Sequence, residues 1–395
     1  MLSRRKPAHP ILQDPALNLL AKLLGRAGAR GPDAGAHDVG AHVTGTIDRA
    51  LAVAGLTQHA GPGVDVRATI DRALTQAGLV RPVGAIAMPQ ARAAARAAVA
   101  DAVATPTAAG EWIARSFSND AGTRSYMLYV PAGYARVASA PVPLVVMLHG
   151  CTQSPDDFAA GTRMNQLADV HGFLVAYPAQ TANANGAKCW NWFRPEDQAH
   201  GRGEPSLIAG IARQVASDYR IDPRRVFVAG LSAGAAMAVI LGETYPDVFA
   251  AVGAHSGLPF AAAHDMASAF TAMKAGPGQA AATPSEATRA TVPTIVFHGD
   301  ADHTVAASNG RAIVRDASLG ADITVETGEV AGGRSYTRKT FADAAGRPRG
   351  EHWLVHGTGH AWSGGSAQGS YTDPAGPDAS EEMVRFFLQL APGAR

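Results

Sequence analysis

The pattern of hydrophobic and polar residues divides the chain near residue 110. From Glu111 onward, short continuous apolar runs alternate with stretches whose apolar residues recur at helical spacing. A continuous apolar run is typical of a strand that is buried on both faces of a parallel sheet. Such strands are predicted, after an early strand and turn at 124–134, at 142–150, 172–178, 224–230, 249–257, 292–299 and 351–357.

Helices are predicted between these strands. Apolar residues recur at helical spacing in 205–219, a small-residue stretch at 233–246 directly follows a strand, and 380–390 is amphipathic. Strands that alternate with helices indicate an open, mostly parallel α/β sheet. The Ala-, Gly- and Pro-rich segment 258–290 fits neither pattern, and we interpret it as an insertion at the rim of the sheet.

Residues 1–110 are different in kind, because they are rich in Ala, Gly and Arg and contain an internal repeat. The copies GTIDRALAVAGL (45–56) and ATIDRALTQAGL (68–79) each carry a short one-sided apolar stripe. Two interpretations remain open: a pair of short helices in a loosely ordered arm, or an element that docks on a hydrophobic surface or a partner subunit. We therefore expect a helical or partly disordered N-terminal extension over 1–110 and an α/β domain over 111–395.

Composition and net charge limit which kinds of molecule this chain is expected to bind. Among 395 residues, 47% are apolar, which is enough for a large core, and 34 basic residues balance 33 acidic ones. The net charge of +1 gives no reason to expect nucleic acid or an acidic membrane surface as a partner. Prolines and Asp14 interrupt the apolar residues near the N-terminus, so neither a signal peptide nor a transmembrane segment is recognised. The expected location is the cytoplasm.

The segment Gly230-Leu231-Ser232-Ala233-Gly234 carries the first chemical signal. It stands where a predicted strand meets a predicted helix, and it fits the G-x-S-x-G nucleophile elbow. A serine on such a turn has strained dihedrals, and glycines on either side relieve the crowding. The alternative is a glycine-rich structural turn. We favour Ser232 as a nucleophile, with the N–H of Ala233 as one donor to an oxyanion.

A serine nucleophile needs a base and an acid, which follow it along the chain in this order: serine, acid, histidine. Asp300 and Asp302 both follow the strand at 292–299, and we favour Asp302 as the acid, with Asp300 as a brace for the loop. His356 and His360 follow the strand at 351–357. His360 lies on the loop and is the expected base, whereas His356 lies at the strand end and is expected to be structural.

The loop after the strand at 142–150 is expected to supply the second oxyanion donor, the N–H of Cys151. Cys189 is the only other cysteine. A disulfide between the two would tie this loop to the tryptophan-rich segment at 189–193. A cytoplasmic location argues against it, whereas the presence of just two cysteines, both on loops at the rim, argues for it. Both redox states remain open. The other histidines lack the spacing of metal ligands, so neither a metal site nor a cofactor is expected.

Several motifs together resemble the poly(3-hydroxybutyrate) depolymerase family of esterases, which is related to feruloyl and acetylxylan esterases. The resemblance covers about residues 115–390 and rests on the motifs at 146–169, 172–178, 189–193, 222–238, 292–305 and 357–365. It implies an α/β-hydrolase fold and a serine esterase. By position, it implies the following roles: Ser232 nucleophile, Asp302 acid, His360 base, and Cys151 and Ala233 oxyanion donors.

The resemblance also implies that Trp190 and Trp192 line an ester-binding groove, and we expect Trp362 and His149 to contact substrate as well. The predicted function is hydrolysis of ester bonds in poly(3-hydroxybutyrate) or its oligomers. A feruloyl- or acetylxylan-type carbohydrate esterase is the alternative within enzymes. A non-catalytic protein that binds polymer granules through residues 1–110 is the alternative outside them. The family also contains secreted members, so secretion is the alternative to a cytoplasmic location.

Overall fold

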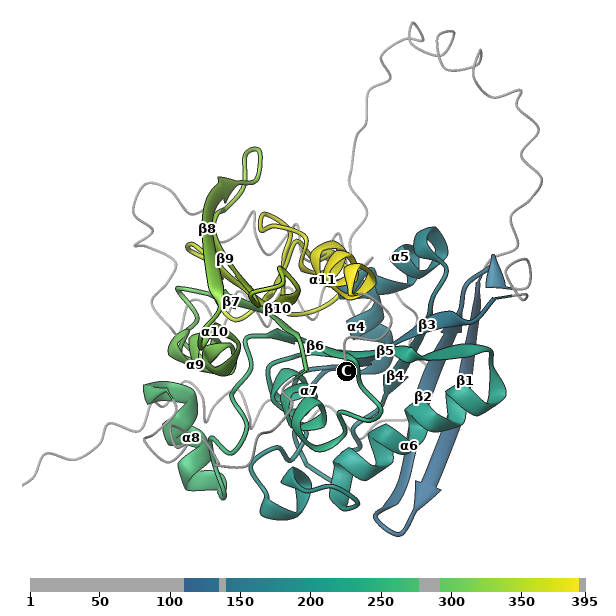
Figure 1. Cartoon of the computed structure of the whole chain (residues 1–395). Helices are drawn as coiled ribbons and strands as arrows, with labels where there is room; N and C mark the ends of the chain where they lie inside the picture. The colour runs from purple at the N-terminus through teal and green to yellow at the C-terminus, as the bar shows by residue number, and fades with distance from the viewer. Residues whose placement is uncertain (1–109, 135–139, 277–291, 391–395) are drawn as a thin grey trace, which may run out of the picture. The chain divides into compact units, whose positions relative to one another are not determined.

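The computed structural model of this chain describes residues 110–134, 140–276 and 292–390 (Figure 1). All of them belong to one compact unit, Ala104–Arg395. The predicted repeat at 45–56 and 68–79 lies outside the described residues, as does the rest of the predicted extension up to residue 109, so these stay predictions. Of the helices in the described ranges, none is long and apolar enough to cross a membrane.

The described strands form one ten-stranded sheet in the order β1-β2-β4-β3-β5-β6-β7-β10-β9-β8. The strands from β4 to β10 in this order are parallel, and antiparallel strands extend the sheet at both edges. Parallel strands place their carboxyl ends at the same edge, where loops of α/β proteins bind ligands. The strands are β1 (Glu111–Asn119), β2 (Gly122–Val130), β3 (Val142–Leu148), β4 (Leu174–Pro178), β5 (Ile221–Leu231), β6 (Ala251–His255), β7 (Thr294–Gly299), β8 (Asp322–Glu329), β9 (Ser335–Ala342) and β10 (Pro348–Val355).

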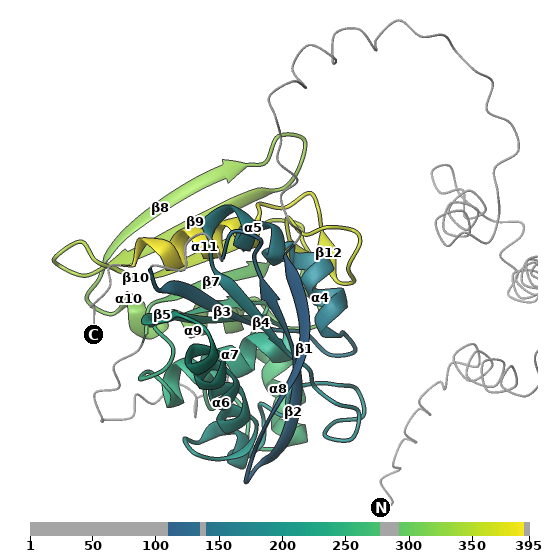
Figure 2. The ribbon, with the colours of Figure 1, turned by 90° about the vertical axis from the view of Figure 1, so that its right-hand side faces the viewer.

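Helices cover both faces of the sheet, α6 and α7 on one face and α5 and α11 on the other (Figures 1 and 2). A short pair of strands, β11 (Trp362–Ser363) and β12 (Thr372–Asp373), lies after β10. The helices are α4 (Pro155–Thr162), α5 (Met164–His171), α6 (Gly203–Asp218), α7 (Ala233–Thr244), α8 (Met266–Ala275), α9 (Ser308–Ile313), α10 (Arg315–Ser318) and α11 (Ala379–Gln389), with a 3₁₀ turn, η3, at Pro195–Gln198.

The buried parts of the central strands are mainly apolar because both of their faces are covered. Every residue of β3 is buried. Leu144 and Val146 pack into the core on the α6–α7 side, whereas Val145 and Met147 pack into the core on the α5–α11 side. Successive side chains of a strand point to opposite faces, so a strand between two helix layers has no polar face. The predicted α/β-hydrolase fold, with a mostly parallel sheet between helices, is therefore confirmed.

Each predicted strand overlaps an observed strand, and the helices predicted at 205–219, 233–246 and 380–390 are α6, α7 and α11. The expected insertion at 258–290 contains α8, which begins with a capping box. Asp265 accepts a hydrogen bond from the N–H of Ser268 at 2.7 Å, while the Ser268 hydroxyl accepts one from the N–H of Asp265 at 3.0 Å. This reciprocal pair satisfies two backbone donors at the helix start.

Candidate active site

Ser232 occupies the single-residue turn between β5 and α7. Its backbone has φ +58° and ψ −119°, a conformation that a residue with a side chain rarely adopts. The Ser232 N–H donates to the carbonyl of His255, the last residue of β6, at 2.9 Å. Strain of this kind persists only where the surrounding structure holds it, and it concentrates at functional sites. The geometry is that of a nucleophile elbow.

The two glycines of the elbow are required by close backbone approach. A Cβ on Gly234 would lie 2.1 Å from the carbonyl oxygen of Leu148, and a Cβ on Gly230 would lie 2.5 Å from the carbonyl of Gly234. Both distances are far below van der Waals contact. Glycine at these positions therefore lets the first turn of α7 rest directly on the end of β3. That contact sets the elbow beside the loop that follows β3.

Asp302 and His360 form a direct pair on the loops that follow β7 and β10. The Asp302 Oδ2 lies 2.7 Å from Nδ1 of His360, and its Oδ1 accepts the N–H groups of Thr304 at 2.9 Å and Val305 at 2.8 Å. Asp302 is 6% exposed. Because Nδ1 donates to the carboxylate, Nε2 of the neutral imidazole is left as a proton acceptor.

The surroundings of Asp302 keep its carboxyl ionised. Burial raises the pKa of Asp302, but hydrogen bonds and charge outweigh it: the bond from His360, the positive charge of that imidazole and the Val305 N–H together lower the pKa to about 2. Asp302 is therefore a carboxylate throughout the neutral range. It can orient His360 and stabilise a positive charge on it.

Within the described residues, no hydrogen bond joins the Ser232 hydroxyl to His360. The order of the strands places Ser232 at the same sheet edge as the Asp302–His360 pair, because β5, β6, β7 and β10 are neighbouring strands. Ser232, Asp302 and His360 all lie just beyond the carboxyl ends of their strands. Catalytic hydrogen bonds are often long before substrate binds. The role of Ser232 as the nucleophile therefore remains a proposal.

Asp300, the competing carboxylate, pairs with His356 instead. Its Oδ2 lies 2.8 Å from Nδ1 of His356, and its Oδ1 accepts the N–H of Gly357 at 2.7 Å. Burial raises the pKa of Asp300, but these bonds lower it overall. The pair ties the end of β7 to the end of β10, so it braces the two loops that carry Asp302 and His360.

The loop after β3, which carries Cys151, lies against the elbow. Leu148 is in register with Gly230, and a Cβ on Gly150 would lie 3.6 Å from the carbonyl oxygen of Leu231. In the described part of the chain, neither the Cys151 N–H nor the Ala233 N–H donates to a protein acceptor. Within those residues, both N–H groups therefore lack a protein acceptor, as the donors of an oxyanion hole must.

His149 holds this loop in place rather than facing a ligand. It is 1% exposed, its Nε2 accepts the N–H of Gln180 at 3.1 Å, and its Nδ1 therefore donates to the carbonyl of Gly150 at 2.7 Å. The Gly150–Cys151 peptide is planar and trans, so fixing the carbonyl of Gly150 also fixes the direction of the Cys151 N–H. Burial lowers the pKa of His149, which keeps this imidazole neutral.

Cys151 and Cys189 are joined by a disulfide. The bond fastens the Cys151 loop to the segment 187–190, and the Thr152 N–H donates to the carbonyl of Ala187 at 2.7 Å beside it. Disulfides persist in oxidising compartments, so this pair does not support the expected cytoplasmic location.

The three tryptophans expected to contact substrate lie in the core. Trp190, Trp192 and Trp362 are 0%, 6% and 1% exposed. The Trp190 indole N–H donates to the carbonyl of His149 at 3.1 Å, and that of Trp362 donates to the Ser380 hydroxyl at 3.0 Å. Large aromatic rings contribute much apolar area, so they are buried where loops need support. As a correction, Trp190 and Trp192 are buried and do not line an ester-binding groove, and the buried Trp362 does not contact substrate. The indole bonds of Trp190 and Trp362 support the loops of the site instead.

Two buried histidines adjoin the Asp302–His360 pair. The Nε2 of His298 lies 2.9 Å from the carbonyl of Val305 and 3.6 Å from Oδ2 of Asp302, and Nε2 of His255 accepts the N–H of Ser363 at 2.9 Å. From the sequence alone no role is predicted for either histidine, because neither has the spacing of a metal ligand. Their position could have indicated that they lie near the site, because both stand at the carboxyl ends of central strands, where the site residues gather.

The buried histidines predict acid sensitivity. Burial lowers the pKa of His255 to about 3 and that of His352 to about 3, whereas an unfolded histidine titrates near about 6.5. The unfolded chain therefore binds more protons as the pH falls below about 6.5, and each histidine removes about 1.4 kcal/mol of stability per pH unit down to about pH 3. The Asp197 carboxyl, whose pKa burial raises to about 6, takes up a proton in the folded state over the same range and offsets the effect of one histidine. We therefore expect the free energy of unfolding, measured by urea titration, to fall by roughly 1.4 kcal/mol per pH unit or more between about pH 6 and 4.

The control compares two histidine variants. His352→Gln should remove the contribution of one proton, so the slope of the free energy of unfolding against pH should become less steep by about 1.4 kcal/mol per pH unit. His264→Gln should leave it unchanged, because the His264 side chain is 78% exposed. A wild-type stability that stays level from pH 7 to pH 4 would contradict the prediction.

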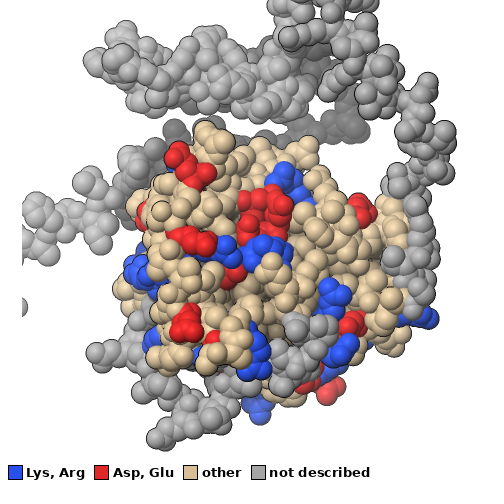
Figure 3. Space-filling model, turned by 45° about the horizontal axis from the view of Figure 1, so that its top comes forward, with Lys and Arg blue, Asp and Glu red and all other residues tan. Residues whose placement is uncertain are grey.

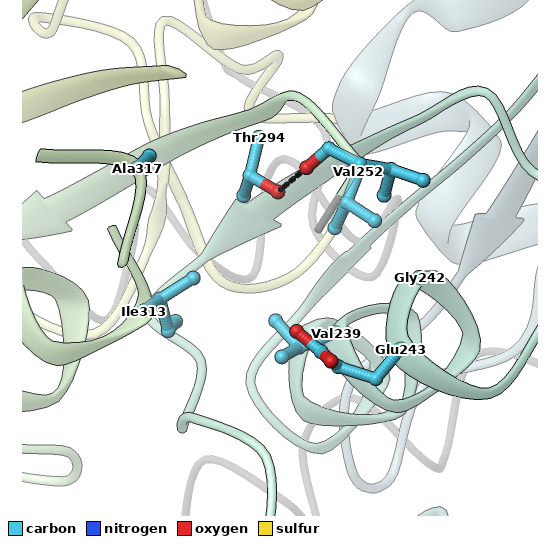
Figure 4. Close-up of a pocket in the computed structure, with 8 residues that line it drawn as sticks. Val239, Gly242, Glu243, Val252, Thr294, Ile313 and Ala317 are labelled. Carbon is cyan, nitrogen blue, oxygen red and sulfur yellow. Dashed lines mark hydrogen bonds between the residues drawn. The ribbon is translucent and has the colours of Figure 1, made fainter. Parts of the chain in front are cut away.

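A small cavity between α7 and the sheet lies away from this site (Figure 4). Its volume of about 30 Å³ fits a single water molecule. It is lined near the amino ends of β6 and β7 by Val252 and Thr294, and the Thr294 hydroxyl donates to the carbonyl of Val292. The site residues stand at the opposite ends of these strands, so this cavity has no part in the chemistry. Within residues 110–134, 140–276 and 292–390, no group of His, Cys, Asp or Glu side chains is arranged to hold a metal ion.

Fold and site together define a class of protein. A mostly parallel sheet with a serine on a strained strand-to-helix turn, followed in the chain by an Asp–His pair, is the arrangement of an α/β-hydrolase. The chain belongs to the family described as Esterase PHB depolymerase, which it matches over residues 124–332.

Proteins with similar sequences are named both as polyester depolymerases and as feruloyl esterases. The chain is 36% identical over 255 residues to Poly(3-hydroxyalkanoate) depolymerase C of Paucimonas lemoignei, which covers 62% of this chain and 60% of that protein. It is 36% identical over 153 residues to Feruloyl esterase B of Neurospora crassa, covering 38% and 50%. The chain thus spans only part of the length of these relatives.

The fold has a structural counterpart as well. The acetyl xylan esterase from Aspergillus awamori superposes with a TM-score of 0.53 at 20% identity, over 71% of this chain and 98% of that one. At this identity the likeness supports the fold alone.

Proposed function

We propose that this chain is a serine esterase in which Ser232, His360 and Asp302 act together. The observation that carries the proposal is the 2.7 Å bond between His360 and Asp302, set at the same sheet edge as the strained Ser232. A neutral imidazole held by a carboxylate is the base that a serine hydroxyl needs. We also propose that residues 111–395 form the catalytic domain.

The proposed reaction has two acyl-transfer steps. His360 Nε2 takes the Ser232 proton as the hydroxyl oxygen attacks the ester carbonyl, and the carbonyl oxygen becomes an oxyanion held by the N–H groups of Cys151 and Ala233. His360 then returns the proton to the departing alcohol, which leaves an acyl group on Ser232. Water then attacks the acyl carbonyl while His360 takes a water proton, and His360 returns it to the Ser232 oxygen as the bond to the acyl group breaks and the acid is released. Each oxyanion donor of this kind contributes roughly 100- to 1000-fold to the rate.

As the substrate we propose poly(3-hydroxybutyrate) or its oligomers. Support comes from the name of the relative from Paucimonas lemoignei and from the extent of that match, which is longer than the match to Feruloyl esterase B. On the face shown in Figure 3, acidic and basic side chains are interspersed among uncharged ones. Neither sign of charge covers this face, so it gives no reason to expect a strongly charged substrate. A polymer-granule surface as partner of residues 1–110 stays a prediction.

A feruloyl- or acetylxylan-type carbohydrate esterase is the second candidate, supported by the relatives with those names. A non-catalytic granule-binding protein is disfavoured, because such a protein has no need of a strained serine beside an oriented imidazole. The test incubates the protein separately with amorphous poly(3-hydroxybutyrate), hydroxybutyrate dimers and feruloylated sugars, and identifies the acids released. Hydroxybutyrate release supports the proposal, and ferulate release alone supports the second candidate.

A matched sample treated with a fluorophosphonate serves as control in every incubation. The reagent should add its mass to the peptide that contains Ser232 and stop all release. A chain that hydrolyses none of these esters and takes up no label would reject the esterase proposal.

A further inference from the structure

Tyr371 stands out because it combines exposure with backbone strain. Its side chain remains 46% exposed, whereas the tryptophans near the site are buried. Its φ is +52°, in the left-handed region that large side chains avoid. Such strain concentrates at ligand and catalytic sites, where neighbouring contacts hold it in place. Thr152, at φ +67°, and Ser232, at φ +58°, share this feature.

The backbone around Tyr371 is anchored to two parts of the candidate site. The carbonyl of Tyr371 accepts the N–H of Trp362 at 2.7 Å, two residues beyond His360. The N–H of the preceding residue, Ser370, donates to Asp157 at 2.8 Å, and the buried amide of Gln153 donates to the Ser370 carbonyl at 3.1 Å. These bonds fix the segment around Tyr371 between the loop that carries His360 and the loop that carries Cys151.

The phenol of Tyr371 also reaches that second loop. Its oxygen lies 3.2 Å from Oγ1 of Thr152, and Oγ1 lies 2.6 Å from the carbonyl of Cys151. A hydroxyl carries one proton, and Thr152 uses its proton on this carbonyl, so the Tyr371 O–H is the donor to Thr152. The ring is therefore held one residue from the proposed oxyanion donor, with part of its surface open to solvent.

We propose that Tyr371 is a substrate-binding residue of the esterase site. Its exposed ring supports the part of a neutral ester chain that extends beyond the scissile carbonyl, such as the next hydroxyacid unit. An aromatic face gains free energy by covering apolar chain atoms, and this gain grows with the length of chain it can cover. The inference rests on the esterase function proposed above and adds a determinant of chain-length preference to it.

The test compares Tyr371→Asn with wild type on p-nitrophenyl acetate, butyrate and octanoate and on hydroxybutyrate trimers. Asn tolerates left-handed backbone, so the variant removes the ring without adding strain. We expect KM to rise on the order of 10-fold for octanoate and the trimer, with about 2-fold or less for acetate and with kcat little changed. Tyr371→Phe keeps the ring and should stay within about 3-fold of wild type on every ester.

Two further variants keep the result interpretable. Ile323→Thr replaces a 53% exposed side chain on the edge strand β8 and should leave every KM unchanged. Thr152→Val removes the hydroxyl that accepts the hydrogen bond from Tyr371. If Tyr371→Asn does not fold, this variant tests the same proposal, and its KM for octanoate should rise severalfold more than its KM for acetate. Equal losses for short and long esters, or none, would overturn the role of Tyr371 and leave the esterase function standing. Wild-type protein that hydrolyses no ester would instead reject the proposed function itself.

Discussion

Replacing Asp302 by Asn is expected to lower kcat for p-nitrophenyl butyrate by about 10⁴-fold, whereas Asp300→Asn should cost about 10-fold or less. The reason is the tautomer of His360. An asparagine amide can donate to Nδ1, which moves the imidazole proton to Nε2, and an Nε2 that carries a proton cannot accept one from Ser232. Asp300 faces His356 instead, so its loss loosens a brace but leaves the His360 tautomer intact.

The two asparagine variants control for each other, since each removes one carboxylate from the same loop. Steady-state kinetics at pH 8 should be read beside thermal unfolding, so that a loss of fold is not mistaken for a loss of chemistry. Equal losses in the two variants, or a larger one in Asp300→Asn, would show that the acid was wrongly assigned and that Asp300 and His356 need to be reconsidered.

The central strands were predictable because burial on two faces leaves an unbroken apolar run. β3 and β5 show this directly, since their inner residues divide between the two cores. β8 and β9 were missed for the opposite reason. β8 lies at the sheet edge with nearly every residue exposed, so its sequence, DITVETGE, carries no apolar run. Pairing at an edge depends on the neighbouring strand, which local sequence does not reveal.

The candidate site divides in a similar way. Ser232, Asp302 and His360 could be proposed from sequence because each directly follows a recognisable strand, and parallel strands end at a common edge. The tryptophans were misjudged, since nearness to a motif does not tell whether a ring points into the core or out of it. Tyr371 was missed because its link to Thr152 spans 219 positions and exists only in the folded chain.

Ser232→Ala carries the largest expected effect, a fall in kcat on the order of 10⁶-fold for p-nitrophenyl butyrate. Without the hydroxyl no acyl-enzyme can form, and only the oxyanion donors and substrate binding remain to assist direct attack by water. The backbone should not respond, because alanine keeps the Cβ and therefore the same cost at φ +58°. The fold of the variant should match wild type by circular dichroism and by melting temperature.

Ser256→Ala is the matched control, because it changes a serine that also has positive φ, at +52°, and that lies just after β6. Its hydroxyl contacts Nδ1 of His255 at 3.3 Å rather than His360. This variant should keep kcat within about 10-fold of wild type, because it loses one buried hydrogen bond and no reacting atom. Fluorophosphonate should label Ser256→Ala and leave Ser232→Ala unmodified. Label on Ser232→Ala, or turnover within 100-fold of wild type in that variant, would mean that another residue forms the acyl-enzyme.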